Sequence, residues 1–458
     1  MLHKTPGSGM RKYGLPLMVG LMLLGQVLRI PTELVSFKKV AIVPNDVALV
    51  AFNIIMLIRN LRSRKLLIRN VLLWKPVLLF VFVCVVGLLV NANYYNLHGN
   101  ELLVSGLYLG RWFFYTTAYL FTVDLIRSRR DVKHLVAALA VGLLAFAAFG
   151  IFQTLELPNF ALIVHPEDTG AVDWDYQYDR LVSTFLDPNL AGCLIAVGLA
   201  FSVAFLMAGY RKVKFAIVIF GAALILTYSR GALLSFFVGL TYLVISGKHR
   251  HRVLVAAGLV GLIVLAAAPY LVSHVQEYNK FTFSDVSAQQ RVANWLLCWD
   301  LIRDNFFLGV GFNTLPYVVP HYGLVSGGGS AFGLDGGLLL IFALSGFVGF
   351  TTYCYLLGKS LWMCHKVANL SKDPLYRVLA RGSFAAVLII VTSAFFTSSL
   401  LYSFIMEFFW MMLALLTFAY VLTKAEQPVP SEAARVRQRV APRARFEPAV
   451  SLTVRGRG

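Results

Sequence analysis

Long apolar segments recur along the whole chain and are separated by short polar stretches. Each segment approaches the roughly 20 residues that an α-helix needs to cross the hydrocarbon layer of a bilayer. Twelve segments fit this description, at positions 13–30, 44–58, 76–91, 102–126, 132–155, 189–208, 215–228, 231–246, 253–272, 336–358, 382–400 and 404–423. The pattern predicts an all-α, polytopic integral membrane protein with about 12 transmembrane helices.

Composition agrees with this prediction. Of the 458 residues, 58% are hydrophobic and only 14% are charged, and the mean hydropathy is +0.72. Soluble domains carry about 25% charged residues, so this chain belongs in lipid. Its five cysteines are scattered, mostly within apolar segments, and have neither the spacing of a disulfide framework nor that of a metal site.

Basic residues lie between the apolar segments. The formal charge is +19, but a nucleic-acid-binding protein would gather its cations on a folded soluble surface, so no nucleic acid partner is expected. Clusters after every second segment hold 32 of the 41 Lys and Arg residues. By the positive-inside rule this side is cytoplasmic, together with both termini. Residues 1–423 are predicted to form a single transmembrane domain and residues 424–458 a basic, disordered cytoplasmic tail.

The apolar stretch 215–246 is too long for one span and short for two. Because basic clusters flank it on both sides, it has to turn back near Ser229, Arg230 and Gly231. Each arm is then about 21 to 24 Å long, which is less than the hydrocarbon thickness of about 30 Å. Arg230 is therefore predicted to lie below the outer membrane surface, where a cation needs a partner or a wet cavity and is a functional candidate.

Two exterior loops, at 156–188 and 273–335, are longer than a simple connection requires. In the second loop Val292, Trp295, Leu296, Trp299 and Ile302 recur at helical spacing. This spacing predicts a short amphipathic helix over 288–305 that lies against the bundle or the membrane surface. The glycines and prolines that follow predict irregular backbone.

Four arginines on the exterior side are candidates for chemistry. Besides Arg230 they are Arg111, which lies within the fourth span, Arg180, which precedes the sixth, and Arg291, which opens the amphipathic helix. The planar guanidinium group of arginine offers paired hydrogen-bond donors and stays charged, so arginine is suited to binding phosphate. Several arginines around one cavity would bind an anionic lipid headgroup and stabilise a leaving diphosphate.

Each of these arginines also has a structural interpretation. Arg111 either binds phosphate or pairs with an intramembrane acid such as Glu407, and Arg180 either binds phosphate or forms a surface salt bridge with an aspartate such as Asp175. Arg291 either joins the site or faces water. The chain has no Walker loop, HExxH motif, dinucleotide fingerprint or nucleophile elbow. We therefore expect no metal and no cofactor, and neither an ATP-driven pump nor a protease.

Three motifs stand in a fixed order. They are Arg180 with 183–192 (STFLDPNLAG), then 228–232 (YSRGA), and then Arg291 with Trp295, 308–311 (LGVG) and Phe312. Together they resemble the O-antigen ligase and polymerase family of bacterial envelopes over roughly residues 102–422. The twelve-span layout, with a large exterior loop before the tenth span, fits this resemblance as well.

The resemblance implies a metal-independent glycosyltransferase of the bacterial cytoplasmic (inner) membrane. Such an enzyme takes a sugar chain from a polyprenyl diphosphate carrier and passes it to an acceptor hydroxyl on the outer face, without a cofactor. Its partners would be the lipid-linked oligosaccharide, membrane lipid and other components of polysaccharide export. Arg180 and Arg230 match the arginines expected to bind the diphosphate, Arg291 and Arg111 are further candidates, and Arg230 is also a catalytic candidate.

One departure from the family pattern bears on the reaction. Ligases of this family carry a His-Asn pair about eleven residues before the glycine of the tenth span, and this register, counted back from Gly346, holds Asp335 and Gly336. The histidine is the usual candidate for activating the acceptor, so its absence favours a polymerase that joins lipid-linked repeat units over a ligase that transfers polymer to lipid A-core. Asp335 is either the general base or the N-cap of the tenth helix, and His321 is an alternative base.

A polysaccharide-lipid flippase or other transporter is the rival hypothesis from a different class. Transporter charges cluster near the midplane of the membrane, often at broken helices in corresponding halves of the chain. In this chain the charges lie toward the outer ends of the predicted spans, and no clear internal repeat is detected. The pattern therefore favours an enzyme.

Overall fold

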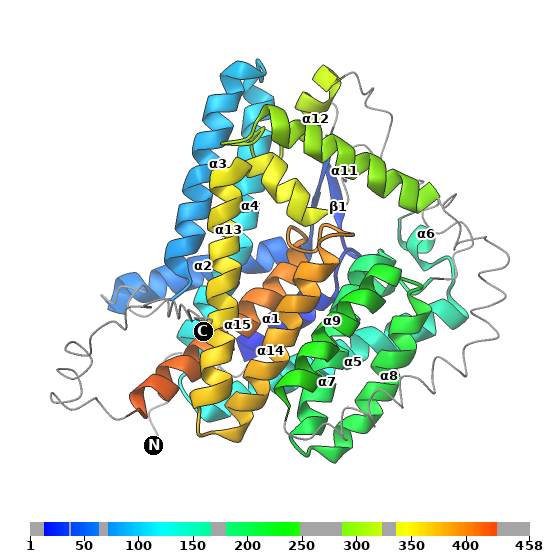
Figure 1. The fold of residues 1–458 in the computed structure, drawn as a ribbon, viewed down its shortest axis with the longest axis vertical. Coiled ribbons are helices and arrows are strands. Elements are labelled where there is room, and N and C mark those ends of the chain that lie inside the picture. The colour runs from blue at the N-terminus through cyan, green and yellow to red at the C-terminus, as the bar shows by residue number, and fades with distance from the viewer. Residues whose placement is uncertain are drawn as a thin grey trace, which may run out of the picture.

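The computed structural model describes residues 13–35, 38–63, 72–165, 180–247, 286–322 and 336–427. These residues form helices and one small hairpin (Figure 1). The longer helices are α2 (Pro44–Ser63), α3 (Trp74–Tyr94), α4 (Gly99–Leu125), α5 (Arg129–Glu156), α7 (Pro188–Met207), α8 (Lys214–Leu226), α9 (Arg230–Ser246), α11 (Val286–Asp304), α13 (Gly337–Leu370), α14 (Pro374–Ser393) and α15 (Ser403–Ala425). The shorter ones are α1 (Leu15–Leu23), α6 (Phe160–Val164), η3 (Ser183–Phe185), η4 (Arg211–Val213), α12 (Leu315–Val318) and η5 (Val319–Tyr322).

The helical architecture is as predicted, with one small hairpin added to it. Strands β1 (Ile30–Val35) and β2 (Lys38–Ile42) pair antiparallel, with Ile30 opposite Ile42. The span predicted at 13–30 is correspondingly shortened to α1, because Gly25 turns the chain with a φ of +58° directly against the carbonyl of Thr184. The N–H of Gln26 donates to that carbonyl at 2.9 Å. A contact between residues so distant in sequence leaves no local signal.

Six of the described helices are long and apolar enough to cross a membrane, judged by length and composition. They are α3, α5, α7, α13, α14 and α15, and α9 is a shorter apolar helix. Large apolar side chains of α3, including Leu79, Phe82 and Leu89, are exposed on the outside of the bundle, as expected where lipid is the solvent. The chain is thus a multi-pass membrane protein. The count of about twelve spans is not confirmed, and the predicted span at 253–272 lies outside the described residues.

Helix α7 forms the centre of one half of the bundle. It packs against α8, α9 and α14, which lie around it in Figure 1, and most of its residues are buried. The turn predicted near Ser229 is confirmed, because α8 ends at Leu226 and α9 begins at Arg230. The N-termini of α7 and α9 are therefore brought side by side.

Helix α11 crosses one end of the bundle (Figure 1), which confirms the helix predicted at 288–305. On the side toward the protein, Cys298, Leu301 and Ile302 are buried, and α11 packs against α13. Its opposite side is also apolar, since Val292, Leu296 and Trp299 are 50%, 62% and 61% exposed. A helix with this exposed apolar stripe is suited to rest on the membrane surface.

Helix α13 is broken at Gly346, where φ is +64° and ψ is −173°. The segment 306–311 fills the break with its own backbone. Phe347 N donates to Phe306 O at 2.7 Å, Val310 N donates to Ala343 O at 2.9 Å, and Gly311 N donates to the next carbonyl of the helix at 3.1 Å. The LGVG motif is thus a backbone plug that restores the hydrogen bonds lost at the break, and it anchors the end of α11 to α13.

We predict that Gly346→Ala destabilises the protein. A Cβ at Gly346 would press on the backbone of Leu308 and Gly309 and would occupy a left-handed conformation, for a loss of at least about 2 kcal/mol. Gly358→Ala in the same helix is the matched control, because a Cβ there meets nothing within 4 Å. The Tm of each purified variant in detergent tests this, and an unchanged Tm for Gly346→Ala would contradict the role of the plug.

Candidate functional site

The segment that carries Arg180 is hydrogen-bonded to the turn that carries Arg230. Arg180 Nε donates to the carbonyl oxygen of Thr227 at 3.1 Å, and Leu181 N donates to Leu226 O at 2.9 Å. Arg180 therefore lies against the last turn of α8, directly before the start of α9. Two arginines that are fifty residues apart in sequence are placed at one end of the same helix pair.

Arg230 is exposed and is held at the first position of α9 by a capped turn. The Ser229 hydroxyl accepts a hydrogen bond from Ala232 N at 3.3 Å and donates to Asn189 Oδ1 at 2.8 Å. Gly192 of α7 allows the turn to approach this closely, because a Cβ there would lie 2.8 Å from the Cβ of Ala232. Asn189, Gly192 and Ser229 thus fix the position of Arg230 relative to α7.

Asp187 connects Arg180 with Arg291. It is the N-cap of α7 and accepts hydrogen bonds from Asn189 N and Leu190 N, both at 2.8 Å. Burial raises the pKa of its carboxyl group, while the Leu190 N–H, Arg180, the Asn189 N–H and Arg291 act to lower that pKa. Arg180 and Arg291 therefore both lie within electrostatic reach of one partly buried carboxyl group, although Arg291 comes from α11.

In the sequence Asp187 stood out only as part of the motif at 183–192, and Arg29 had no predicted role. Burial raises the pKa of the Tyr402 hydroxyl, Asp187 raises it further, and Arg29 lowers it. Tyr402 also accepts a hydrogen bond from Gln26 Nε2 at 2.8 Å and donates to Phe185 O at 3.3 Å. The end of α1 and the start of α15 thus border the same cluster, and Arg29 is a further cation beside it. No local pattern would have placed it there.

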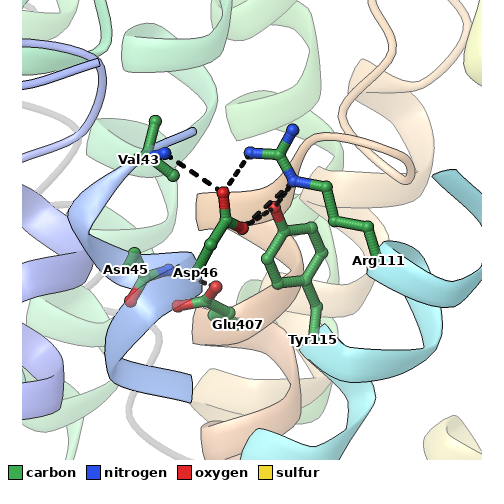
Figure 2. Close-up of polar contacts among 6 residues, drawn as sticks. All are labelled: Val43, Asn45, Asp46, Arg111, Tyr115 and Glu407. Atoms are coloured by element: carbon green, nitrogen blue, oxygen red, sulfur yellow. Dashed lines mark hydrogen bonds and ion pairs between the residues drawn. The ribbon is translucent and has the colours of Figure 1, made fainter. Parts of the chain in front are cut away.

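Arg111 belongs to a different cluster, which joins α2, α4 and α15 (Figure 2). Its Nε and Nη2 donate to Oδ1 and Oδ2 of Asp46 at 3.0 Å and 2.6 Å. The acid suggested by the sequence was Glu407, but this side chain instead accepts a hydrogen bond from Asn45. Of the two interpretations of Arg111, the ion pair is the one with visible contacts, and its part in binding phosphate stays a prediction.

Asp335 and the aspartates suggested for Arg180, such as Asp175, lie outside the described residues. The first residue before α13 that the structure describes is its N-cap Gly336, with a φ of +100°. Both interpretations of Asp335, as general base and as helix cap, stay predictions. The alternative base, His321, lies next to Tyr95, with 5.6 Å between the ring centroids.

An apolar groove of about 600 Å³ runs between α3 and α4. It has no charged lining residue, so it is distinct from the arginine cluster. The side chains and glycines that line it are Val81, Val85, Leu88, Leu89, Gly99, Leu102, Leu103, Gly106, Leu107, Leu109, Gly110 and Phe113.

Within the described ranges no group of three or more His, Cys, Asp or Glu side chains is placed to hold a metal ion. The site consists instead of cations at helix ends. Arg180, Arg291 and Arg29 lie near Asp187 and Tyr402, and Arg230 lies on the adjoining turn. This geometry defines a multi-pass membrane protein with a cluster of arginines at one end of its bundle.

A protein-family model described as O-antigen ligase matches residues 215–354. The matched region starts in α8, contains Arg230, Arg291 and the LGVG plug, and ends in α13. The chain therefore carries the O-antigen ligase domain, which confirms the resemblance to the O-antigen ligase and polymerase family. No curated protein matches the chain.

We predict that Asp187→Asn preserves the fold and flattens the dependence of stability on pH. Asparagine caps helices about as well as aspartate, whereas Asp187→Ala should cost about 1 kcal/mol. Because the pKa of Asp187 is raised in the folded protein, the folded state holds this proton more tightly than the unfolded state does. Its contribution is thus present at low pH and is lost as the pH rises through the carboxyl range, from about pH 4 upward.

The measurement is the Tm of the wild type and both variants in detergent from about pH 4 to 7. Asp187→Asn should match the wild-type Tm near pH 4, where the carboxyl group is largely neutral, and should exceed it slightly at neutral pH, because Asn does not ionise and loses this part of the slope. If Asp187→Asn is as unstable as Asp187→Ala at pH 7, the attraction between the carboxylate and its arginines outweighs burial, and the assignment is wrong.

Proposed function

We propose that the protein is a polymerase of lipid-linked polysaccharide repeat units, of the O-antigen or exopolysaccharide type. It transfers glycan from a polyprenyl diphosphate carrier to an acceptor sugar hydroxyl. The observation that carries this proposal is the convergence of Arg180, Arg291 and the Arg230 turn around the N-termini of α7 and α9. Helix N-termini and arginine side chains both favour phosphate anions.

In the proposed reaction the acceptor hydroxyl gives its proton to a base, for which Asp335 is the candidate. The acceptor oxygen bonds to the anomeric carbon while the bond from this carbon to the diphosphate breaks, and both electrons of that bond stay on the diphosphate. Arg230 and Arg180 stabilise the charge that develops there, together with Arg291. This chemistry needs neither a metal ion nor a cofactor. Arg111, which is held by Asp46, would contribute less.

The reaction is proposed to take place on the outer face of the bacterial cytoplasmic membrane, with both termini in the cytoplasm. This orientation follows from the positive-inside rule. It places α11 outside, where Val292, Leu296 and Trp299 would rest on the membrane surface. The lipid-linked oligosaccharide and membrane lipid are the proposed partners, together with other components of polysaccharide export.

Transfer of polymer to lipid A-core is the second candidate, because the matching family model is described as O-antigen ligase. The absence of the His-Asn pair at 335–336 favours the polymerase. A flippase is disfavoured on a separate ground. The break in α13, which would be the natural midplane site of a transporter, is filled by the backbone of 306–311.

The glycan profile of a deletion strain tests the proposal. A polymerase is expected to leave a surviving single repeat unit on the surface with no long chains. Accumulation of long chains that remain on the lipid carrier would instead identify a ligase, and unprocessed repeat units trapped on the cytoplasmic side would identify a flippase.

We predict that Arg230→Lys folds but loses activity. Lysine keeps the charge and lacks the planar fork that holds two phosphate oxygens. Losing one charge-assisted hydrogen bond in the transition state should raise the barrier by about 1.5 to 3 kcal/mol, which is roughly a ten- to hundredfold loss of rate. Arg180→Lys should behave in the same way.

The measurement is polymer length and amount in the deletion strain complemented with each variant at matched membrane expression. Arg303→Lys is the control, because Arg303 lies on α11, is 68% exposed and pairs with Asp304 and Asp300 on its own helix. It should give wild-type polymer. Wild-type polymer from Arg230→Lys would refute the bidentate role and leave Arg230 as an anchor of the turn.

A further inference from the structure

Two buried side chains, one on α2 and one on α15, each have an oxygen without a hydrogen-bond partner among the described residues. Asn45 and Glu407 are both 0% exposed, and Asn45 Nδ2 donates to Glu407 Oε1 (Figure 2). The remaining oxygens, Asn45 Oδ1 and Glu407 Oε2, are buried and have no hydrogen-bond partner within the part of the chain that the structure describes. An unpaired buried oxygen is costly, and two on paired groups call for an explanation.

The charges around Glu407 indicate that its carboxyl group is neutral. Arg111 is bound in bidentate fashion by Asp46, whose carboxylate also accepts hydrogen bonds from the Tyr115 hydroxyl at 2.7 Å and from Val43 N at 3.1 Å. The carboxylate of Asp46 repels a negative charge on Glu407, and the guanidinium of Arg111 attracts it. Tyr115 also lies within electrostatic range of Glu407. Asp46 therefore already balances Arg111, and an ionised Glu407 would add a second negative charge to a cluster with one cation. A buried charge without its own counter-charge is strongly disfavoured.

We propose that Glu407 binds a proton and shares it with Asn45 in a closed acid–amide ring. The carboxyl O–H of Glu407 donates from Oε2 to Asn45 Oδ1, while Asn45 Nδ2 donates to Glu407 Oε1. A single proton thus supplies the missing partner of both oxygens and removes the excess charge. The ligand of this site is a proton, and the site stands independently of the proposed function, because none of its residues lies in the Asp187 cluster.

The ring has a structural consequence for Arg111. Asn45 and Asp46 are neighbours at the start of α2, so the link between Asn45 and α15 also fixes the carboxylate that holds Arg111 on α4. Three helices are joined by one neutral ring and one ion pair. Arg111 then mainly joins the helices, which agrees with the smaller part given to it in binding the diphosphate.

Glu407→Gln is the decisive variant, because glutamine is the neutral isostere of the protonated acid. Its Nε2 can donate to Asn45 Oδ1 and its Oε1 can accept from Asn45 Nδ2, so the ring survives. We expect an unchanged Tm in detergent. Glu407→Leu, which leaves the Asn45 amide unpaired, and Asp46→Asn, which removes the counter-charge of Arg111, should each lower the Tm by several degrees.

An infrared difference spectrum of wild type minus Glu407→Gln at neutral pH gives an independent readout. We expect the carbonyl stretch of a protonated carboxyl group in the wild type and its loss in the variant. A carboxylate band in its place overturns the proposal, and so does a clear shift of the Glu407→Gln Tm in either direction. A wild-type Tm that rises with added NaCl or KCl, and does not do so in Glu407→Gln, would assign the site to a monovalent cation.

Discussion

Every backbone N–H and C=O group at a helix end within the membrane protein has to find a partner, because lipid supplies none. At the candidate site, side chains that satisfy these backbone groups also position the arginines. Asp187 caps α7, Ser229 caps α9, and Arg180 binds the carbonyl of Thr227 near the end of α8. The residues that close the helix ends are thus the ones that hold the arginines in place.

The same constraint explains the plug at Gly346. Breaking α13 exposes carbonyl and N–H groups, and the segment 306–311 pairs with them. Asn91 of α3 secures the plug by donating to Gly309 O at 2.7 Å. The plug connects α11, and with it Arg291, to the membrane helices. A motif that looks like part of an active site in the sequence therefore acts through position, by fixing the helix that brings Arg291 to Asp187.

The two polar clusters differ in their balance of positive and negative charge. Around Asp187, Arg180 and Arg291 act on one carboxyl group and Arg29 lies near Tyr402, so positive charges outnumber negative ones in this cluster. Around Asp46, one arginine meets one carboxylate in a bidentate pair, and Glu407 is linked to an amide. The first cluster is fit for binding and the second for joining helices. Residue type alone does not separate them, because both are arginine and acid pairs.

The sequence by itself determined what depends on local spacing. Apolar segments predicted the membrane helices, the glycine and charge at 229–231 predicted the turn between α8 and α9, and helical spacing predicted α11. The ordered motifs also indicated the resemblance to the O-antigen ligase family, whose model matches residues 215–354. These features are local, because the apolar period and the capping residues that specify a helix lie within or next to its own segment.

Only the tertiary structure decided which distant residues meet. It paired Arg111 with Asp46 in place of Glu407, brought Arg29 and Arg291 to the Asp187 cluster, and put Gly336 at the N-cap of α13. It also added the hairpin at 30–42 and set Gly309 against Gly346. Such contacts depend on how the helices pack and on which side chains then lie within hydrogen-bonding distance of a buried polar group. Neither can be read from the spacing of residues within a single segment.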